Sequence, residues 1–257
     1  MMFGRTLAWM LLVAPLAAAA SESVKLDRLP ADINPHDMAS LQRGAQVYVN
    51  YCQGCHSLAY MRYNRLQDLG LTEQQIKDNL IFTGVKVGEL MKIAMDPRDS
   101  KDWFGTPPPD LTVIARSRSS SAGSGADWLY SYLRGFYRDP SRPTGWNNTV
   151  YPNVAMPHVL WQLQGEQVLT TKVQSIPLGS KGEVEKREEQ KLVLEKAGSM
   201  KPAEYDRMVG DLVNFLVYVS EPSRQFRVEL RIYVLLFLGV LFVLAYLLKK
   251  EYWKDVH

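Results

Sequence analysis

Two apolar runs lie at opposite ends of the chain, and they differ in length and in the residues that flank them. The first covers residues 7–14, lies after the positive charge of Arg5 and leads into three alanines at residues 18–20. This order is typical of a secretory signal peptide, because the run is too short to span a bilayer and polar residues come after it. We therefore expect residues 1–20 to be a signal peptide and the domain beyond them to be exported.

The second apolar run, residues 232–248, carries no charge along its whole length. As a helix it would cover about 26 Å, at the short end of what a hydrocarbon core requires. Arg231 and Lys249 flank the run and can reach the headgroups, and the run lacks the polar stripe of a core helix. We predict a helix over 223–250 that contains this membrane anchor. The tail 249–257 is basic, which favours the cytoplasmic side for it.

These assignments leave residues 21–222 as one exported domain. It is expected on the periplasmic side of the inner (cytoplasmic) membrane, held there by a single-pass anchor. About two hundred residues are enough for one domain with its own core. The chain carries a net charge of +3, of which Arg5 and the basic tail each supply one, so the domain itself is nearly neutral. This balance excludes a nucleic-acid binder and makes long-range steering by net charge weak.

Within the exported domain, the spacing of apolar residues predicts several helices. Apolar positions three and four residues apart predict a helix over 41–52, with Asp37 or Ser40 as its N-cap. The capping-box pattern of residues 72–75, Thr-Glu-Gln-Gln, predicts a second and shorter helix. Asp127 is expected to cap a third helix that ends eight residues later at a glycine.

The segments between these helices are rich in proline, glycine or charge. Residues 96–109 and 139–153 contain several prolines and glycines and are expected to be loops. Residues 161–173 are compatible with a small hairpin, and the Lys- and Glu-rich residues 179–201 with a solvated helix or a surface insertion. Pro202 can open the last soluble helix at its first turn.

Both cysteines of the chain lie in one short segment, Asn50-Tyr51-Cys52-Gln53-Gly54-Cys55-His56-Ser57. A disulfide or a thiol-exchange pair would not explain the adjacent histidine, and thiol-exchange motifs usually open a helix after a strand. A zinc site would need at least one of the three remaining histidines. Cys-x-x-Cys-His is instead the signature of covalent haem attachment. We therefore predict one haem c, attached through Cys52 and Cys55, with His56 as an iron ligand.

The second axial position of the iron has two main candidates, Met156 and His158. Met156 lies in a loop that Pro152 and Pro157 stiffen, about a hundred residues beyond His56, which is ample chain to reach the other face of the haem. Ligation by a thioether would raise the reduction potential, as an electron carrier requires, so Met156 is favoured. Ligation by His158 would instead give a haem of lower potential.

Several further motifs accompany the haem motif and the C-terminal anchor along nearly the whole exported chain. They are Arg43-Gly44-Ala45-Gln46-Val47-Tyr48, Pro108-Pro109-Asp110-Leu111-Thr112, Ile114-Ala115-Arg116-Ser117-Arg118, Asp127-Trp128, Ala155-Met156-Pro157, Phe215-Leu216 and Ser220-Glu221-Pro222. In this order they resemble the cytochrome c1 family, the haem subunits of cytochrome bc1 (quinol–cytochrome c reductase) complexes.

The resemblance implies a mainly α fold, a cytochrome c-like haem domain with loop insertions plus one C-terminal transmembrane helix. In that fold, the helix before the haem motif crosses the last soluble helix. The family pattern makes Cys52 and Cys55 the thioether links and His56 and Met156 the axial ligands. It also matches Arg118 to an arginine that pairs with a haem propionate.

The resemblance also implies partners and a function. The family accepts electrons from the Rieske iron–sulfur protein, beside cytochrome b in a dimeric complex, and passes them to a soluble or tethered cytochrome c. Such a chain is the electron-transfer subunit of an oxidoreductase and has no bond-making catalytic residue of its own. The alternatives are a membrane-anchored cytochrome c that donates directly to a terminal oxidase, a haem peroxidase in which Met156 is not bound, and a haemless scaffold.

Overall fold

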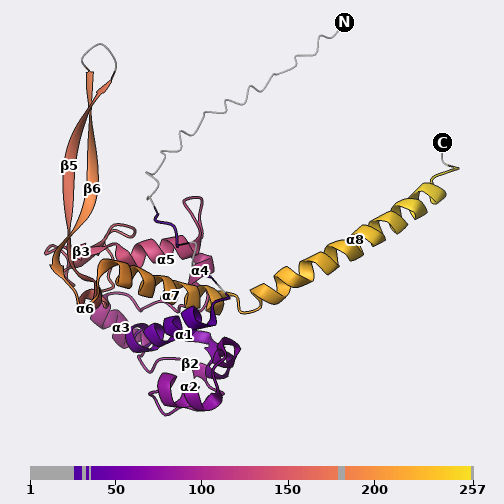
Figure 1. Cartoon of the computed structure of the whole chain (residues 1–257), viewed down its shortest axis with the longest axis horizontal. Coiled ribbons are helices and arrows are strands. Elements are labelled where there is room, and N and C mark those ends of the chain that lie inside the picture. Colours follow the sequence, from indigo (N-terminus) through magenta and orange to yellow (C-terminus); the bar gives the residue numbers. More distant parts are fainter. Residues whose placement is uncertain (1–25, 31–32, 35, 179–182, 256–257) are drawn as a thin grey trace, which may run out of the picture.

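The computed structural model describes residues 26–30, 33–34, 36–178 and 183–255. The predicted signal peptide, residues 1–20, therefore lies outside the described residues. A globular part built mainly of helices carries two extensions, a long β-hairpin and a long C-terminal helix (Figure 1).

The described strands pair as three antiparallel two-stranded sheets, β1 with β2, β3 with β4 and β5 with β6. In chain order the described elements are α1 (Met38–Val47), the π-helix η1 (Tyr48–Cys52), β1 (Leu58–Arg62), the 3-10 helix η2 (Tyr63–Leu69), α2 (Glu73–Leu80), β2 (Leu90–Met91), α3 (Pro97–Phe104), α4 (Ile114–Ser117), α5 (Gly125–Arg134), β3 (Phe136–Arg138), β4 (Trp146–Asn148), α6 (Trp161–Gln164), β5 (Gly165–Leu178), β6 (Glu183–Ala197), α7 (Pro202–Ser220) and α8 (Arg224–Tyr252).

The centre of the globular part is the crossing of α1 with α7. The two helices approach closely because Gly44 has no side chain: a Cβ there would lie 2.1 Å from the carbonyl oxygen of Asp211. The rings of Tyr48 and Phe215 pack beside the crossing with their centroids 5.8 Å apart. Arg43 of α1 links the two helices by donating two hydrogen bonds to the Asp211 carboxylate of α7, at 2.6 and 3.1 Å. The expected crossing of these two helices is therefore confirmed, and it fixes the end of α1 that leads into the haem motif.

The helix starts agree with the sequence at two positions and differ at a third. Asp37 caps α1 by accepting hydrogen bonds from the N–H groups two and three residues ahead, so Asp37 rather than Ser40 is the N-cap. The capping box over 72–75 opens α2 as predicted. The N-cap of α5 is Ser124, and Asp127, the third residue of the helix, completes its capping box. The expectation that Asp127 itself caps this helix was wrong, because the helix begins earlier: the Ser124 hydroxyl accepts from the Asp127 N–H, and the Asp127 carboxylate accepts from the Ser124 N–H.

Two segments expected to be irregular contain regular structure. Residues 97–104, inside the predicted loop 96–109, form α3, whose N-cap is Asp96 and whose end is Gly105 in the left-handed conformation. Pro97 occupies the first turn, where the missing N–H costs nothing. In the predicted loop 139–153, the short strand β4 pairs with β3.

The charged segment 179–201, expected to be a solvated helix or a surface insertion, is not a helix where the structure describes it, and most of it is a strand. Residues 183–197 form β6, which pairs antiparallel with β5 over its full length, for example Val168 with Val193. The small hairpin expected within 161–173 was wrong, because residues 161–164 form α6 and residues 165–173 belong to the single strand β5, whose partner is β6. The β5–β6 hairpin extends well beyond the globular part (Figure 1).

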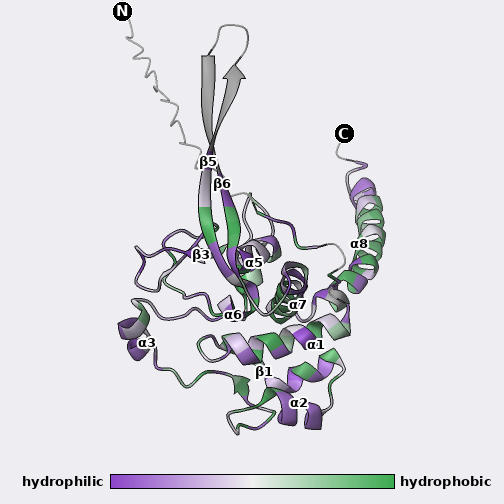
Figure 2. Cartoon of the chain, turned by 60° about the vertical axis from the view of Figure 1, so that its left-hand side comes forward, coloured by the Kyte–Doolittle hydropathy of each residue, from purple (hydrophilic) through white to green (hydrophobic). Residues whose placement is uncertain are grey.

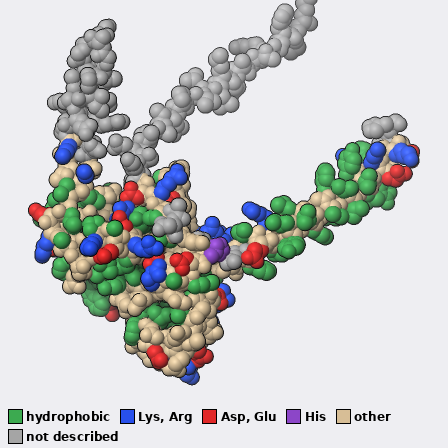
Figure 3. Space-filling view, viewed as in Figure 1, with side chains coloured by type: hydrophobic (Ala, Val, Ile, Leu, Met, Phe, Trp, Pro, Cys, Tyr) green, Lys and Arg blue, Asp and Glu red, His purple; other side chains and the backbone are tan. Residues whose placement is uncertain are grey.

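The last helix, α8, is separated from α7 by a three-residue break, and Pro202 opens α7 as predicted. In the described part of the chain, α8 is the one helix long and apolar enough to cross a membrane. The candidate span is Phe226–Tyr252, and its most apolar window of 18 residues has a mean hydropathy of 2.5 and is not buried in the protein. Its ribbon is largely hydrophobic in colour in Figure 2, and hydrophobic side chains cover most of its visible face in Figure 3.

Candidate haem site

The haem motif forms a tight turn at the end of η1. The backbone N–H groups of Cys55 and His56 both donate to the carbonyl oxygen of Cys52, at 3.1 and 2.9 Å. The hydroxyl of Tyr48 donates to the His56 carbonyl oxygen at 2.6 Å, which ties the turn back to the helix before it. Both thiols are free, that of Cys52 buried and that of Cys55 half-buried. The turn therefore presents two thiols and one imidazole from five consecutive residues.

The His56 ring is oriented by a backbone carbonyl from another part of the chain. Its Nδ1 lies 2.7 Å from the carbonyl oxygen of Pro109, which can accept only from a protonated Nδ1. The other nitrogen, Nε2, is then unprotonated and available to a metal. Burial lowers the pKa of His56, although the bond to Pro109 and the charge of Asp110 oppose this effect, so the neutral ligand form is favoured.

The segment that carries Pro109 is held against the haem motif by further hydrogen bonds. The N–H of Leu111 donates to the Ser57 carbonyl oxygen at 2.9 Å, and the N–H of Ala59 donates to the Asp110 carboxylate at 2.7 Å. The other carboxylate oxygen of Asp110 accepts from the Thr112 N–H at 2.8 Å. Asp110 therefore locks the Pro109 carbonyl in the position that orients His56.

Met156 lies in a loop that asparagine side chains shape. The side-chain oxygen of Asn148 accepts from the N–H groups of Val150 and Tyr151, and its amide donates to the carbonyl oxygen of Tyr132 at 2.8 Å. The Asn147 side-chain oxygen accepts from the Asn153 N–H at 2.8 Å. Asn153 has a positive φ of 64°, a conformation in which asparagine is enriched. These contacts fold the loop back onto α5.

The Met156 sulfur meets an aromatic stack on one face of α5. The hydroxyl of Tyr132 donates to Met156 Sδ at 3.3 Å. The Tyr132 ring stacks on Trp128, one helical turn earlier, with centroids 4.8 Å apart and planes 12° apart. Burial raises the pKa of Tyr132, so its hydroxyl keeps its proton and can donate.

Arg118 joins the same stack from its other side. Its guanidinium carbon lies 4.5 Å from the centre of the Trp128 ring and 5.6 Å from that of Tyr151. The side chain is half-buried, whereas that of Arg116 is exposed. The structure thus brings Arg118 and Met156 together through Trp128, and it does not bring Arg116 there. A half-buried guanidinium that lies over an aromatic ring suits an anionic group such as a propionate.

His158, the rival of Met156, lies in a different environment. Its ring is almost completely buried, stacks on Phe136 with centroids 4.8 Å apart, and meets the edge of Trp146. Burial lowers its pKa to about 4. Its Nε2 has no hydrogen-bond partner among the described residues. A neutral imidazole between two aromatic rings is compatible with packing, and the open Nε2 keeps His158 as a competitor to be tested.

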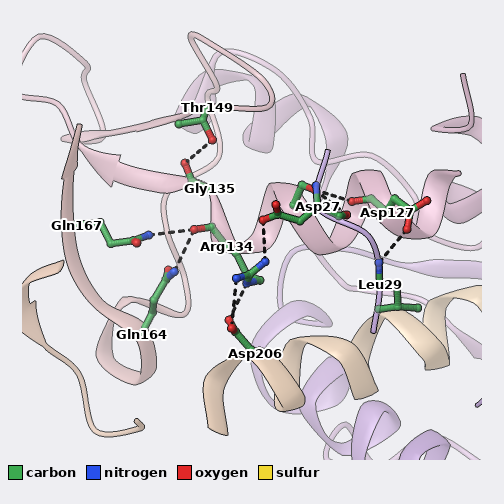
Figure 4. A network of polar contacts seen from close by, with 10 residues as sticks. Asp27, Leu29, Asp127, Arg134, Gly135, Thr149, Gln164, Gln167 and Asp206 are labelled. Carbon is green, nitrogen blue, oxygen red and sulfur yellow. Dashed lines mark hydrogen bonds and ion pairs between the residues drawn. The ribbon is translucent and has the colours of Figure 1, made fainter. Parts of the chain in front are cut away.

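The helix that carries Tyr132 is clamped at its C-terminal end. Arg134 donates to Asp206 of α7 at 2.6 Å and to Asp27 at 2.8 Å, and its carbonyl oxygen accepts from Gln164 and Gln167 (Figure 4). This network ties α5 to α7 and to the base of the β5–β6 hairpin. A second link runs next to it, because the Tyr205 hydroxyl of α7 donates to the Leu133 carbonyl oxygen at 2.9 Å, beside Tyr132.

The donor set of these residues fits a c-type haem. Cys52 and Cys55 supply two unpaired thiols, and His56 supplies a nitrogen ligand whose orientation is fixed. Met156 supplies a thioether, and Arg118 a cation next to the same aromatic stack. Sequence reasoning missed Tyr132 and the orienting carbonyl of Pro109. A four-residue spacing from Trp128 could have revealed Tyr132, whereas the sequence has no signal for a backbone carbonyl.

Comparisons with known proteins identify the family of the chain. The model of the Cytochrome C1 family matches residues 31–256. The chain is 50% identical over 255 residues to cytochrome c1 of Allochromatium vinosum, covering 98% of each chain. It is 49% identical over 248 residues to a Nitrosomonas europaea protein named ammonia monooxygenase gamma subunit, covering 96% of each. It is also 27% identical to cytochrome c1 of Rhodospirillum rubrum, covering 86% of this chain and 83% of that one. The family model agrees with the name of the Allochromatium vinosum relative, which is cytochrome c1.

Proposed function

This chain belongs to the cytochrome c1 family, and from that premise we propose how its site carries electrons and where it works. Members are membrane-anchored c-type cytochromes with covalent haem, the electron-transfer subunits of bc1 complexes that pass electrons to cytochrome c. The observation that carries the proposal is the turn from Cys52 to His56, with two free thiols and an imidazole whose Nε2 is available.

Each site residue has a proposed role. Cys52 and Cys55 would hold the haem through thioether bonds, and His56 and Met156 would supply the nitrogen and the sulfur that bind its iron. Arg118 pairs with a propionate while its guanidinium rests on the Trp128 ring. When bound, the haem supplies a one-electron couple between ferric and ferrous iron, and thioether ligation keeps its potential high.

The chain's own contribution to electron transfer is a site that barely moves. The bond from His56 to the Pro109 carbonyl holds the imidazole in one orientation and one tautomer. The loop shaped by Asn147 and Asn148, together with the clamped α5, holds Met156. Neither ligand has to rotate when the charge of the site changes by one, so the passage of an electron requires little rearrangement.

The partners and orientation in this proposal are inferred from family membership and the anchor. The electron donor is a Rieske iron–sulfur protein that has been reduced next to cytochrome b, and the acceptor is a soluble or tethered cytochrome c. The haem domain faces the periplasm, because the basic end of α8, with Lys249 and Lys250 in its last turn, favours the cytoplasmic side. A signal peptide at residues 1–20 and a dimeric complex belong to the same proposal.

The first test is a spectrum and subunit analysis of the complex extracted from native membranes in detergent. We expect one covalent haem c per chain in the pyridine haemochrome assay, and co-purification with cytochrome b and a Rieske protein. A chain that carries haem but purifies with a terminal oxidase would support the alternative of direct donation. A chain without covalent haem would refute both the proposed function and the assignment of Cys52 and Cys55 to haem attachment.

The second test distinguishes the axial ligands with two matched variants. Met156→Leu should keep the covalent haem, lose the weak far-red sulfur-to-iron band of the oxidised state and lower the midpoint potential. Electron delivery from the Rieske centre would then run uphill, and quinol oxidation coupled to cytochrome c should collapse. His158→Leu should keep both the band and the potential. If His158→Leu alone changes the ligation, His158 is the ligand and the carrier has a lower potential.

A further inference from the structure

The Met156 sulfur is a hydrogen-bond acceptor as well as a proposed ligand. The hydroxyl oxygen of Tyr132 lies 3.3 Å from Sδ and donates to it. A thioether sulfur has two lone pairs, so it can accept this bond and still offer one pair to a metal. The contact joins residues 24 positions apart that come from two different structural units, the helix α5 and the asparagine-shaped loop.

The hydroxyl of Tyr132 is held in place independently of Met156. The ring is buried, stacks on Trp128, and meets Phe136 edge-on with centroids 5.2 Å apart. The backbone of Tyr132 accepts a hydrogen bond from Asn148, the residue that shapes the Met156 loop. A group held by these contacts can fix a flexible methionine, which has three rotatable bonds and otherwise adapts to its surroundings.

We propose that Tyr132 is a positioning residue, whose hydrogen bond holds the Met156 sulfur and raises the reduction potential of the haem. The inference rests on the proposed role of Met156 as axial ligand. A donor on the sulfur draws electron density from it, so the sulfur stabilises ferric iron less than a free thioether would. The reduced state is therefore favoured. One electron arrives from the donor protein and leaves to the acceptor, and the hydroxyl proton stays on Tyr132 throughout.

The size of the effect can be worked from the strength of one hydrogen bond. A neutral hydrogen bond contributes about 0.5–1.5 kcal/mol net, which corresponds to about two- to tenfold in an equilibrium constant. If the bond acts mainly on one oxidation state, Tyr132→Phe shifts the reduction equilibrium toward the oxidised form by up to about tenfold. For a one-electron couple this is a fall in midpoint potential of up to ~59 mV.

The experiment compares Tyr132→Phe with Tyr205→Phe in the full-length chain within its membrane complex. Tyr205 is also buried and donates its hydroxyl to a carbonyl oxygen, that of Leu133, so its variant loses a comparable bond away from the sulfur. Tyr132→Phe should lower the midpoint potential, shift the far-red sulfur-to-iron band without abolishing it, and let added imidazole displace the sulfur at lower concentration. Tyr205→Phe should lower thermal stability, leave the band in place and change the potential much less than Tyr132→Phe does.

The outcomes separate this inference from the ligand assignment. An unchanged potential in Tyr132→Phe, beside a lowered potential in Met156→Leu, would overturn the role of Tyr132 alone. An unchanged band and potential in Met156→Leu would overturn the ligand itself. If Tyr132→Phe fails to assemble, incorporation of 3-fluorotyrosine at position 132 keeps the ring and strengthens the donor. The potential should then rise, and a fall or no change would refute the inference.

Discussion

The close contact between α1 and α7 provides a sharp test of how the haem motif is positioned. At Gly44, an added Cβ would lie 2.1 Å from the carbonyl oxygen of Asp211 and 2.7 Å from Cβ of Phe215. Both obstacles belong to or adjoin the backbone of α7, so no side-chain rotation can relieve them. Gly44→Ala therefore requires α1 and α7 to separate by roughly 1 Å before ordinary carbon contacts are restored.

The expected magnitude reflects two opposing effects. Overpacking a well-packed contact costs about 1–3 kcal/mol, and more where the structure cannot yield. Replacing a helical glycine by alanine contributes about 1 kcal/mol in the opposite direction. Since separation of the helices would also stretch the pair between Arg43 and Asp211, we expect a net loss of about 2 kcal/mol. In a domain of this size such a loss lowers Tm by about 4–8 °C.

The assay is thermal denaturation of the haem-loaded chain in detergent, monitored by the haem absorption and by circular dichroism. Gly210→Ala is the matched control, because it lies in α7 as well but its Cβ would meet only the side chain of Ile33, at 2.9 Å. That side chain can rotate away, and the control should change Tm by a few degrees at most. Equal stability of the two variants would refute the view that the approach at Gly44 fixes α1.

Three further predictions concern charge and anchoring. Arg43→Ala should destabilise the chain by about 3–5 kcal/mol in denaturant unfolding, because it leaves the buried Asp211 carboxylate unpaired, whereas Asp211→Ala leaves a half-exposed guanidinium and should cost about 1–3 kcal/mol. The reverse order would contradict this asymmetry. Arg118→Gln should lower the midpoint potential more than Arg116→Gln in a redox titration, and equal potentials would speak against the propionate role. Truncation before Ile232 should release a soluble, haem-loaded domain, and retention in the membrane pellet would show that another segment anchors it.

The parts of the fold that could be predicted from the sequence are those whose structure depends on residues close along the chain. The helix before the haem motif begins at Asp37 because a single carboxylate satisfies two N–H groups of its first turn. The Thr72 capping box and the first-turn Pro202 are equally local signals. The apolar run from 232 to 248 needs no partner to be recognised, because the lipid rather than the protein surrounds it.

The parts that sequence missed depend on competing or distant interactions. Pro97 has the pattern of a helix breaker, although at the first turn it favours a helix, and only Asp96 before it distinguishes the two roles. The Lys- and Glu-rich residues of β6 have helix-forming propensity, but they pair with β5, which is richer in β-branched residues. Strand pairing satisfies the backbone of both segments, and it outweighs a weak local preference.

The candidate site likewise has a part that the sequence predicts and a part that depends on distant residues. The turn from Cys52 to His56 could be predicted because the chemistry of haem attachment requires all three side chains within five residues. The surroundings of Met156 could not, because the loop takes its shape from Asn147 and Asn148, whose amides act on backbone groups rather than on a motif. In our proposal, ligand identity is therefore encoded locally, whereas the property that matters for an electron carrier, the reduction potential, depends on contacts such as that of Tyr132 with Met156, which only the folded chain brings together. Two chains with the same haem motif and the same methionine can then differ in potential without any change in ligand.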